Sequence, residues 1–144
     1  MTLVDANVLL YASDEDDVRH EASRDLVERC RRGDVPGAVT SGILAEFVAG
    51  LTWTKRPIPV SPAAAQTALV RLMAGRLSLL PVTSEGVRLF ARLVSRHGLA
   101  GQDVHDAHHA ALAITGGCDV VATFDQDHWA RFVDEGLAVL VPQR

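Results

Sequence analysis

The segment VHDAHH, at residues 104–109, contains three histidines and one aspartate. His105 and His109 are four residues apart, so on a helix their side chains share one face, as a pair of zinc ligands can. His105 and Asp106 also form the His-Asp pair of a histidine-based metal hydrolase. No second cluster of histidine ligands accompanies them, because the others are scattered: His20, His97 and His128. The alternative is that Asp106 alone does chemistry and the histidines are its neighbours.

Carboxylates in four separate segments support that alternative. Asp5 follows the apolar run TLV, and Asp125 follows VVATF, so each is expected to end a strand. Asp106 lies in the first turn of an expected helix, and Glu46 lies about one turn into the helix after GAVTS. In an open parallel sheet, sites form outside the carboxyl ends of the strands. We therefore expect these four acids to converge at one edge of the sheet.

Convergent carboxylates imply a bound cation or a bound proton. Two ionised groups about 4 Å apart repel by about 4 kcal/mol at an effective dielectric constant near 20. Either some are protonated at neutral pH, or a divalent cation lies among them. Oxygen ligands select hard cations such as Mg²⁺ or Mn²⁺. An open acidic site suits phosphodiester hydrolysis, in which metal ions activate water and stabilise the charge on the phosphate.

Each acid also has a purely structural interpretation. Asp5 can cap the helix that follows it, and Glu46 can be a solvated helix residue. The first-turn acids of the helix at 103–115 favour the positive end of its dipole, with Asp103 the better N-cap candidate. Asp125 and Asp127 can be turn residues. The set of four is more specific than any single member.

Alternating strands and helices must position these residues. Short apolar runs predict strands at residues 2–5, 37–41, 77–82, 118–124 and 137–141. Helical spacing and end signals predict helices at residues 6–13, 18–32, 62–75, 84–97 and 103–115, one more with Ser41 as its N-cap, and a short one near 125–132. This alternation predicts an α/β fold: a single domain with a mostly parallel sheet and helices on both faces.

Composition narrows the class further. The 144 residues are 48% hydrophobic, which excludes intrinsic disorder and allows a substantial core. The net charge of −4 excludes nucleic-acid binding by overall charge alone, so a phosphate-bearing substrate needs local cations. Cys30 and Cys118 match no zinc or disulfide spacing. No segment predicts a membrane span or a signal peptide, so a cytoplasmic location is expected.

Four segments resemble, in the same order and at compatible spacing, the signature segments of PIN-domain ribonucleases: LVDANVLLYA, ILAEF, VHDAHHAALAITGG and VVATFDQDHWARF. The resemblance is strongest to the VapC toxins of toxin–antitoxin pairs and extends from Thr2 to about Val141. Any one segment is a weak signal, whereas the ordered set is a strong one. The resemblance implies the PIN-like α/β fold.

The resemblance also assigns roles to residues. The family's acidic metal-binding positions correspond to Asp5, Glu46, Asp106 and Asp125. Glu46 would bind the ion directly or through water, and the three aspartates would bind Mg²⁺ or Mn²⁺ directly. Polar residues that support these ligands are expected to be Asn7, Thr123, Asp127 and Asp103. One departure is His128 before Trp129, where the family often has an aromatic residue.

The function implied is that of an endoribonuclease that leaves a 3′-hydroxyl and a 5′-phosphate. Family members typically form homodimers and are inhibited by a cognate VapB-type antitoxin. Lys55 and Arg56, beside Trp53 in a proline-rich loop, are the best candidates for RNA contacts. Two other functions stay open: a histidine/aspartate metal-dependent phosphohydrolase, and a non-catalytic module that binds an antitoxin. The sequence does not indicate which RNA is cleaved.

We expect the histidines next to Asp106 to be its neighbours rather than metal ligands. If Asp106 faces the site, His109 lies nearby at three residues' distance, whereas His105 and His108 point progressively away. We therefore expect loss of Asp106 to abolish cleavage and His105→Ala to be tolerated.

Overall fold

The computed structural model describes residues 1–143 and contains one sheet of five parallel strands. The strands follow the order β3-β2-β1-β4-β5 across the sheet. Their bounds are β1 (Thr2–Val4), β2 (Gly37–Thr40), β3 (Ser78–Leu80), β4 (Val120–Ala122) and β5 (Ala138–Leu140). Every neighbouring pair is parallel, so the predicted α/β class with a parallel sheet is confirmed.

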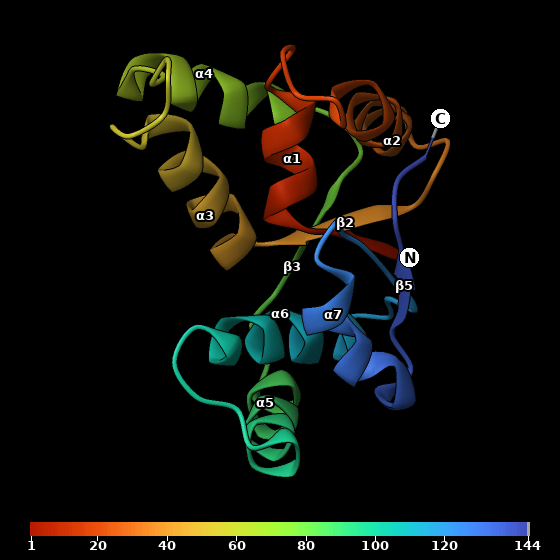
Figure 1. Cartoon of the computed structure of the whole chain (residues 1–144). Helices are drawn as coiled ribbons and strands as arrows, with labels where there is room; N and C mark the ends of the chain where they lie inside the picture. Colours follow the sequence, from red (N-terminus) through yellow and green to blue (C-terminus); the bar gives the residue numbers. More distant parts are fainter. Residues whose placement is uncertain (144) are drawn as a thin grey trace.

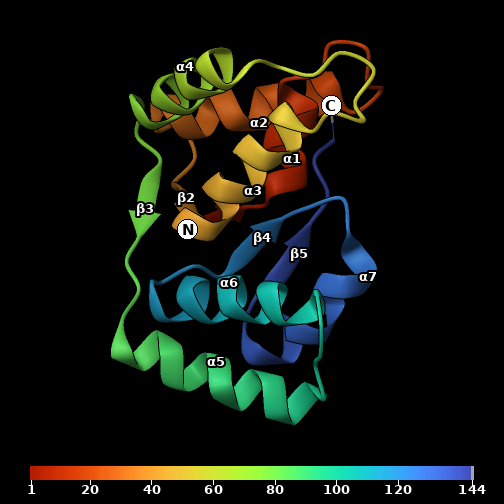
Figure 2. The same ribbon diagram turned by 90° about the vertical axis from the view of Figure 1, so that its left-hand side faces the viewer.

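Helices cover both faces of this sheet (Figures 1 and 2). One layer contains α1 (Ala6–Ala12), α2 (His20–Arg32), α3 (Ser41–Thr52) and α4 (Pro62–Met73). The other contains α5 (Ser84–His97), α6 (Asp103–Thr115), α7 (Gln126–Trp129) and the 3-10 helix η1 (Ala130–Glu135). The chain runs from β1 through β2 to β3, then returns to β4 and continues to β5. Connections between parallel strands are right-handed. Helices that connect strands toward one edge of the sheet therefore lie on one face, and helices that connect strands toward the other edge lie on the opposite face.

The reversal of direction creates a crevice between β1 and β4. These strands are neighbours, with Val4 paired to Ala122, yet the chain leaves them toward opposite edges of the sheet. Ligand sites of open parallel sheets lie at such a point, beyond the carboxyl ends of the two strands. Asp5 follows β1 and Thr123 follows β4, so both residues lie at this crevice.

Several predicted boundaries are wrong by a few residues. The strands are shorter than expected: Pro81, for example, has no N–H to continue the β3 ladder. The N-cap of α3 is Thr40 rather than Ser41, because the Thr40 hydroxyl accepts the Ile43 N–H at 3.1 Å. Asp103 is the first residue of α6 and does not cap it. Helix α2 begins at His20 rather than residue 18, and α4 ends at Met73 rather than residue 75.

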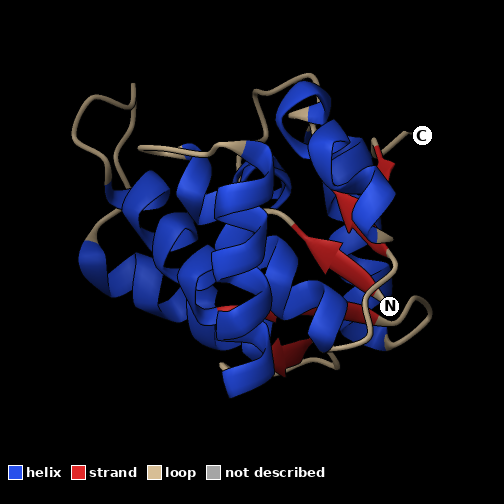
Figure 3. Ribbon diagram, turned by 90° about the horizontal axis from the view of Figure 1, so that it is seen from below, coloured by secondary structure: helices blue, strands red, loops and turns tan. Residues whose placement is uncertain are grey.

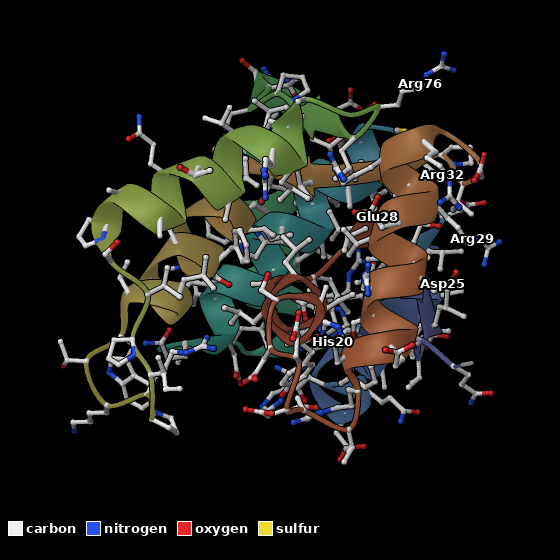
Figure 4. The ribbon with its side chains drawn as sticks, turned by 90° about the horizontal axis from the view of Figure 1, so that it is seen from above. His20, Asp25, Glu28, Arg29, Arg32 and Arg76 are labelled. Atoms are coloured by element: carbon white, nitrogen blue, oxygen red, sulfur yellow. The ribbon has the colours of Figure 1, made fainter. Side chains whose placement is uncertain are left out.

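The core lies on both faces of the central strands. Helix α2 shows how a helix divides its faces: Leu26, Val27 and Cys30 are buried, whereas Figure 4 shows Asp25 and Arg29, which pair at 3.6 Å, on its outer side. Figure 3 shows the strands (red) packed beside the helices (blue). Within residues 1–143, no helix combines the length and the apolar character needed to cross a membrane.

The packing of α5 predicts the effect of two substitutions on stability. Leu93 is fully buried on this helix, whereas Val87 on the same helix is 47% exposed. We expect Leu93→Ala to lower the free energy of unfolding by about 2–5 kcal/mol, because it removes buried apolar surface and leaves a cavity. The control Val87→Ala should change it by less than about 0.5 kcal/mol. Urea denaturation followed by circular dichroism measures both, and equal losses would contradict the packing described here.

Candidate active site

Asp5 is the most buried acid of the crevice, at 8% exposure. It caps α1: its Oδ1 accepts the Ala6 N–H at 2.7 Å. Its Oδ2 accepts the Thr123 hydroxyl at 2.7 Å and the Asn7 amide at 2.9 Å. Burial raises the pKa of Asp5, and the hydrogen bonds from Thr123 and Ala6 oppose that rise. The structural role as an N-cap and the position at the crevice therefore coexist in one side chain.

Thr123 and Asn7 join the end of β4 to the start of α1. The Thr123 Oγ1 accepts the Asn7 amide at 3.0 Å and the Asp125 N–H at 3.0 Å. The Asn7 Oδ1 accepts the Phe124 N–H at 3.2 Å. Thr123 is fully buried, so its hydroxyl depends on these partners. Together the two side chains fix the backbone that carries Asp125 relative to Asp5.

Asp106 projects from the first turn of α6 and is partly buried. Its pKa rises from its ordinary value to about 6, first because of burial and then because of the negative charge on Asp5. Asp125 acts in the same direction, whereas His109 and His128 oppose it. Burial is thus the main cause of the shift, and the negative charges on Asp5 and Asp125 add to it.

Glu46 lies on α3 and is held by a histidine of α6. His109 is only 2% exposed, and its Nε2 lies 3.0 Å from the Glu46 Oε1. Its Nδ1 lies 2.9 Å from the Thr40 Oγ1. The hydrogen bond from His109 lowers the pKa of Glu46, whereas burial opposes this effect. From the sequence we identified His109 as a neighbour of the acidic site but missed Thr40. The only role that the local sequence could suggest for Thr40 is that of a helix N-cap.

Asp125 is the most exposed of the four acids, and a histidine covers it. The Nδ1 of His128, on α7, lies 2.7 Å from each carboxylate oxygen of Asp125. The hydrogen bond with Asp125 raises the pKa of His128. Asp103 lies close to the same histidine, since its Oδ1 is 3.8 Å from the Nε2 of His128, and its Oδ2 accepts a hydrogen bond from Arg131 at 3.2 Å. Sequence reasoning assigned no role to His128 or Arg131.

An open hollow of about 360 Å³ collects these groups. Its lining comes from α3, α6, α7 and the residues just before α6 and α7: Glu46, Gln102, Asp103, His105, Asp106, Asp125 and His128. Asp5 does not line the hollow; it lies buried beside it, where its charge acts on Asp106. The structure thus brings the four predicted acids to one place. Among residues 1–143, no three His, Cys, Asp or Glu side chains are close enough to surround an ion unaided.

The three histidines of VHDAHH lie in three different surroundings. His109 is buried against α3, and His108 packs edge-to-face on Phe90 of α5 at 5.4 Å between ring centres. His105 lines the hollow beside Asp106, so the expectation that it points away from the site is wrong. The reason is that α6 begins at the rim of the hollow and presents its first turn to it. The alternative in which His105 and His109 bind one metal together does not fit this arrangement, because His109 bonds to Thr40 and Glu46 instead.

The hollow is also not lined by the predicted residues Asp127, Lys55 and Arg56. Asp127 is exposed on α7. Lys55 and Arg56 belong to the loop after α3, at the opposite end of that helix from β2 (Figure 1). Arg56 pairs with Asp14 at 3.6 Å and is 19% exposed, whereas Lys55 is exposed. Of this pair, Lys55 has the side chain that is free to reach a second molecule.

Comparison with known proteins gives a family for this arrangement. Residues 2–134 match the model of the PIN domain. Ribonuclease VapC43 of Mycobacterium tuberculosis is 34% identical over 117 residues, which cover 79% of each chain.

Solved structures agree on the fold. The toxin VapC20 of Mycobacterium tuberculosis, described as cleaving the sarcin-ricin loop, superposes with a TM-score of 0.68 at 18% identity and covers 90% of this chain and 94% of its own. VapBC2 of Rickettsia felis, bound to a DNA fragment from its promoter, gives 0.66 at 16% identity and covers 99% and 98%. By the match along its sequence and by its fold, this chain belongs to the PIN-domain family and, within it, to the VapC ribonucleases.

Proposed function

We propose that residues 1–144 form one nuclease domain, a Mg²⁺- or Mn²⁺-dependent endoribonuclease that serves as the toxin of a toxin–antitoxin pair. One observation carries the proposal: carboxylates from four separate segments meet where β1 and β4 end, with Glu46, Asp106 and Asp125 lining one hollow and Asp5 buried beside it. Such crowding is unfavourable by itself and is relieved by a cation. The curated relative VapC43 carries the name ribonuclease.

The residues present fit a hard divalent cation. All four acids offer oxygen ligands, the type that Mg²⁺ and Mn²⁺ prefer. Asp5, Asp106 and Asp125 would hold the ion, with Glu46 bound directly or through water. Within residues 1–143, no three acidic, His or Cys side chains are close enough together to hold an ion by themselves. Water would therefore complete the coordination, as is usual for Mg²⁺. The hollow has room for this water and for a phosphate group.

The reaction proposed is attack of water on the phosphorus, with cleavage of its bond to the 3′-oxygen. An ion held by Asp5, Asp106 and Asp125 would supply positive charge for the phosphate and would lower the pKa of water. Glu46, a carboxylate held by the hydrogen bond with His109, would accept the proton of the attacking water. Thr123 and Asn7 hold Asp5 in a fixed orientation. The leaving oxygen takes a proton, which gives a 3′-hydroxyl and a 5′-phosphate.

The partners proposed follow from the same family. We infer a cognate VapB-type antitoxin, an RNA substrate and a homodimer. The structural neighbour VapC20 is described as acting on an RNA loop, so RNA is the substrate class to test first. Lys55 is the candidate for phosphate contact outside the hollow.

Activity should depend on the buried acid and not on exposed negative charge. Asp5→Asn should lower RNA cleavage in Mg²⁺ by at least about 100-fold, because the neutral amide no longer balances the charge of the ion. Asp127→Asn is the matched control, since this aspartate is exposed and outside the hollow. It should cleave within about twofold of the wild type. A purified wild type that cleaves no RNA in a broad panel would favour the non-catalytic module instead.

The raised pKa of Asp106 predicts how stability changes with pH. The folded-state pKa is raised to about 6, so the ionised group destabilises the fold increasingly as pH rises from about 4 to 6. At about pH 7.5 without metal, Asp106→Asn should be more stable than the wild type by about 1–2 kcal/mol, after allowance for partial exposure. Below about pH 4 this difference should vanish.

The measurement is thermal unfolding in EDTA and in excess Mn²⁺. Mn²⁺ should raise the Tm of the wild type and leave that of Asp106→Asn nearly unchanged, because a bound ion stabilises only the state that binds it. A stability difference that stays constant from acid to neutral pH would contradict the proposed repulsion.

A further inference from the structure

His109 makes contacts that the mechanism above does not use. It lies on α6, yet its partners belong to one short segment, residues 40–46, that contains the end of β2 and the first turns of α3. Its Nδ1 lies 2.9 Å from the Thr40 Oγ1, and its Nε2 lies 3.0 Å from the Glu46 Oε1. His109 is only 2% exposed and has a hydrogen-bond partner at both ring nitrogens, so its position and orientation are fixed.

The hydrogen bonds around this ring form a complete chain. Glu46 is a carboxylate and only accepts, so the Nε2 of His109 donates to it. The Thr40 Oγ1 accepts the Ile43 N–H at 3.1 Å and is also the hydrogen-bond partner of the Nδ1 of His109. Both ring nitrogens of His109 and the Thr40 hydroxyl therefore have hydrogen-bond partners in this row. The cap of α3 and the carboxylate of Glu46 are thus connected through one imidazole.

Gly42 makes room for the ring. A Cβ on Gly42 would lie 2.6 Å from the Cε1 of His109, closer than real contacts allow. The ring cannot move aside cheaply, because hydrogen bonds hold it on both sides. The backbone of α3 therefore approaches the imidazole as closely as a residue without a side chain permits.

We propose that His109 is a positioning residue that fixes the carboxylate of Glu46 at the rim of the acidic hollow. The proposal rests on the proposed function, since Glu46 acts on RNA only if the hollow is a nuclease site. Glu46 has a long side chain that is 45% exposed, so it would sample several rotamers without a partner. The bond from His109 selects one of them before substrate arrives, which is the usual service of a residue behind a ligand.

Two substitutions separate this role from simple filling of the core. In His109→Gln the side-chain amide nitrogen takes the place of Nε2 and can still donate to Glu46. In His109→Asn the amide is shorter, takes the place of Nδ1 and cannot reach Glu46. Both residues are polar amides, so a purely structural role would be affected similarly by both.

The direct readout is the rotamer of Glu46 in the metal-free protein, measured by NMR three-bond couplings across its side chain. Wild type and His109→Gln should show one rotamer, and His109→Asn should show averaged couplings. In RNA cleavage at saturating Mn²⁺, His109→Asn should lower kcat about 10–100-fold with little change in KM, whereas His109→Gln should stay within about fivefold. Equal couplings and equal kcat for the two variants would overturn the proposal.

Coupling to Glu46 supplies an independent test. In a Glu46→Ala background, His109→Asn should change kcat by less than about twofold, because the residue through which it acts is absent. An unchanged 10–100-fold loss there would show that His109 acts otherwise. Gly42→Ala keeps both His109 and Glu46 but should displace the imidazole ring of His109. Its effect should therefore resemble that of His109→Asn. If the substitutions at His109 unfold the protein, the Gly42→Ala variant provides the test. Wild-type couplings for Glu46 in that variant would then overturn the proposal.

Failure of the nuclease assignment would look different. A wild type that cleaves no RNA, or an Asp5→Asn variant that cleaves as fast as the wild type, would remove the proposed function. The Glu46 couplings would still report whether His109 fixes this side chain, because they need neither RNA nor metal.

Discussion

The hydrogen bond from Thr123 to Asp5 joins two strand ends that are 118 residues apart in the sequence. It forms where β1 and β4 lie side by side and the chain leaves them in opposite directions. Without this bond, the most buried carboxylate of the site would keep the Ala6 N–H and the Asn7 amide as donors but would lose its connection to the residue that follows β4. The same hydroxyl accepts the Asp125 N–H, so one buried threonine positions two of the four acids.

Negative charge at this point costs stability, and the structure limits the cost in different ways for different residues. Hydrogen bonds to Thr123 and Ala6 lower the pKa of Asp5 against the effect of burial. His109 lowers the pKa of Glu46, and His128 contacts both oxygens of Asp125. Asp106 has less compensation, and its pKa reaches about 6. A site that is strained in this way without a cation is suited to bind one, because functional sites commonly sacrifice stability for preorganised charge.

The fold and the acids were predictable because their signals are local. Apolar runs that end in Asp5 and near Asp125 mark strand ends, and the parallel topology brings such ends together. The roles of the histidines were not predictable. His109 meets Thr40 only because α6 packs beside β2, and no spacing within VHDAHH indicates that contact. The bounds of α6 were predicted correctly, but His105 lines the hollow because of how this helix packs against the rest of the fold, which its own sequence does not indicate.

The central claim is that the ends of β1 and β4 hold a divalent cation. Anomalous diffraction from crystals of the protein grown with Mn²⁺ tests it most directly, because the manganese signal locates the ion without reference to activity. We expect one or more peaks within coordinating distance of carboxylate oxygens of Asp5 and Asp106, with water among the other ligands. A protein that cleaves RNA while its manganese lies elsewhere, for example on the imidazole of His105 away from Asp5, would contradict it.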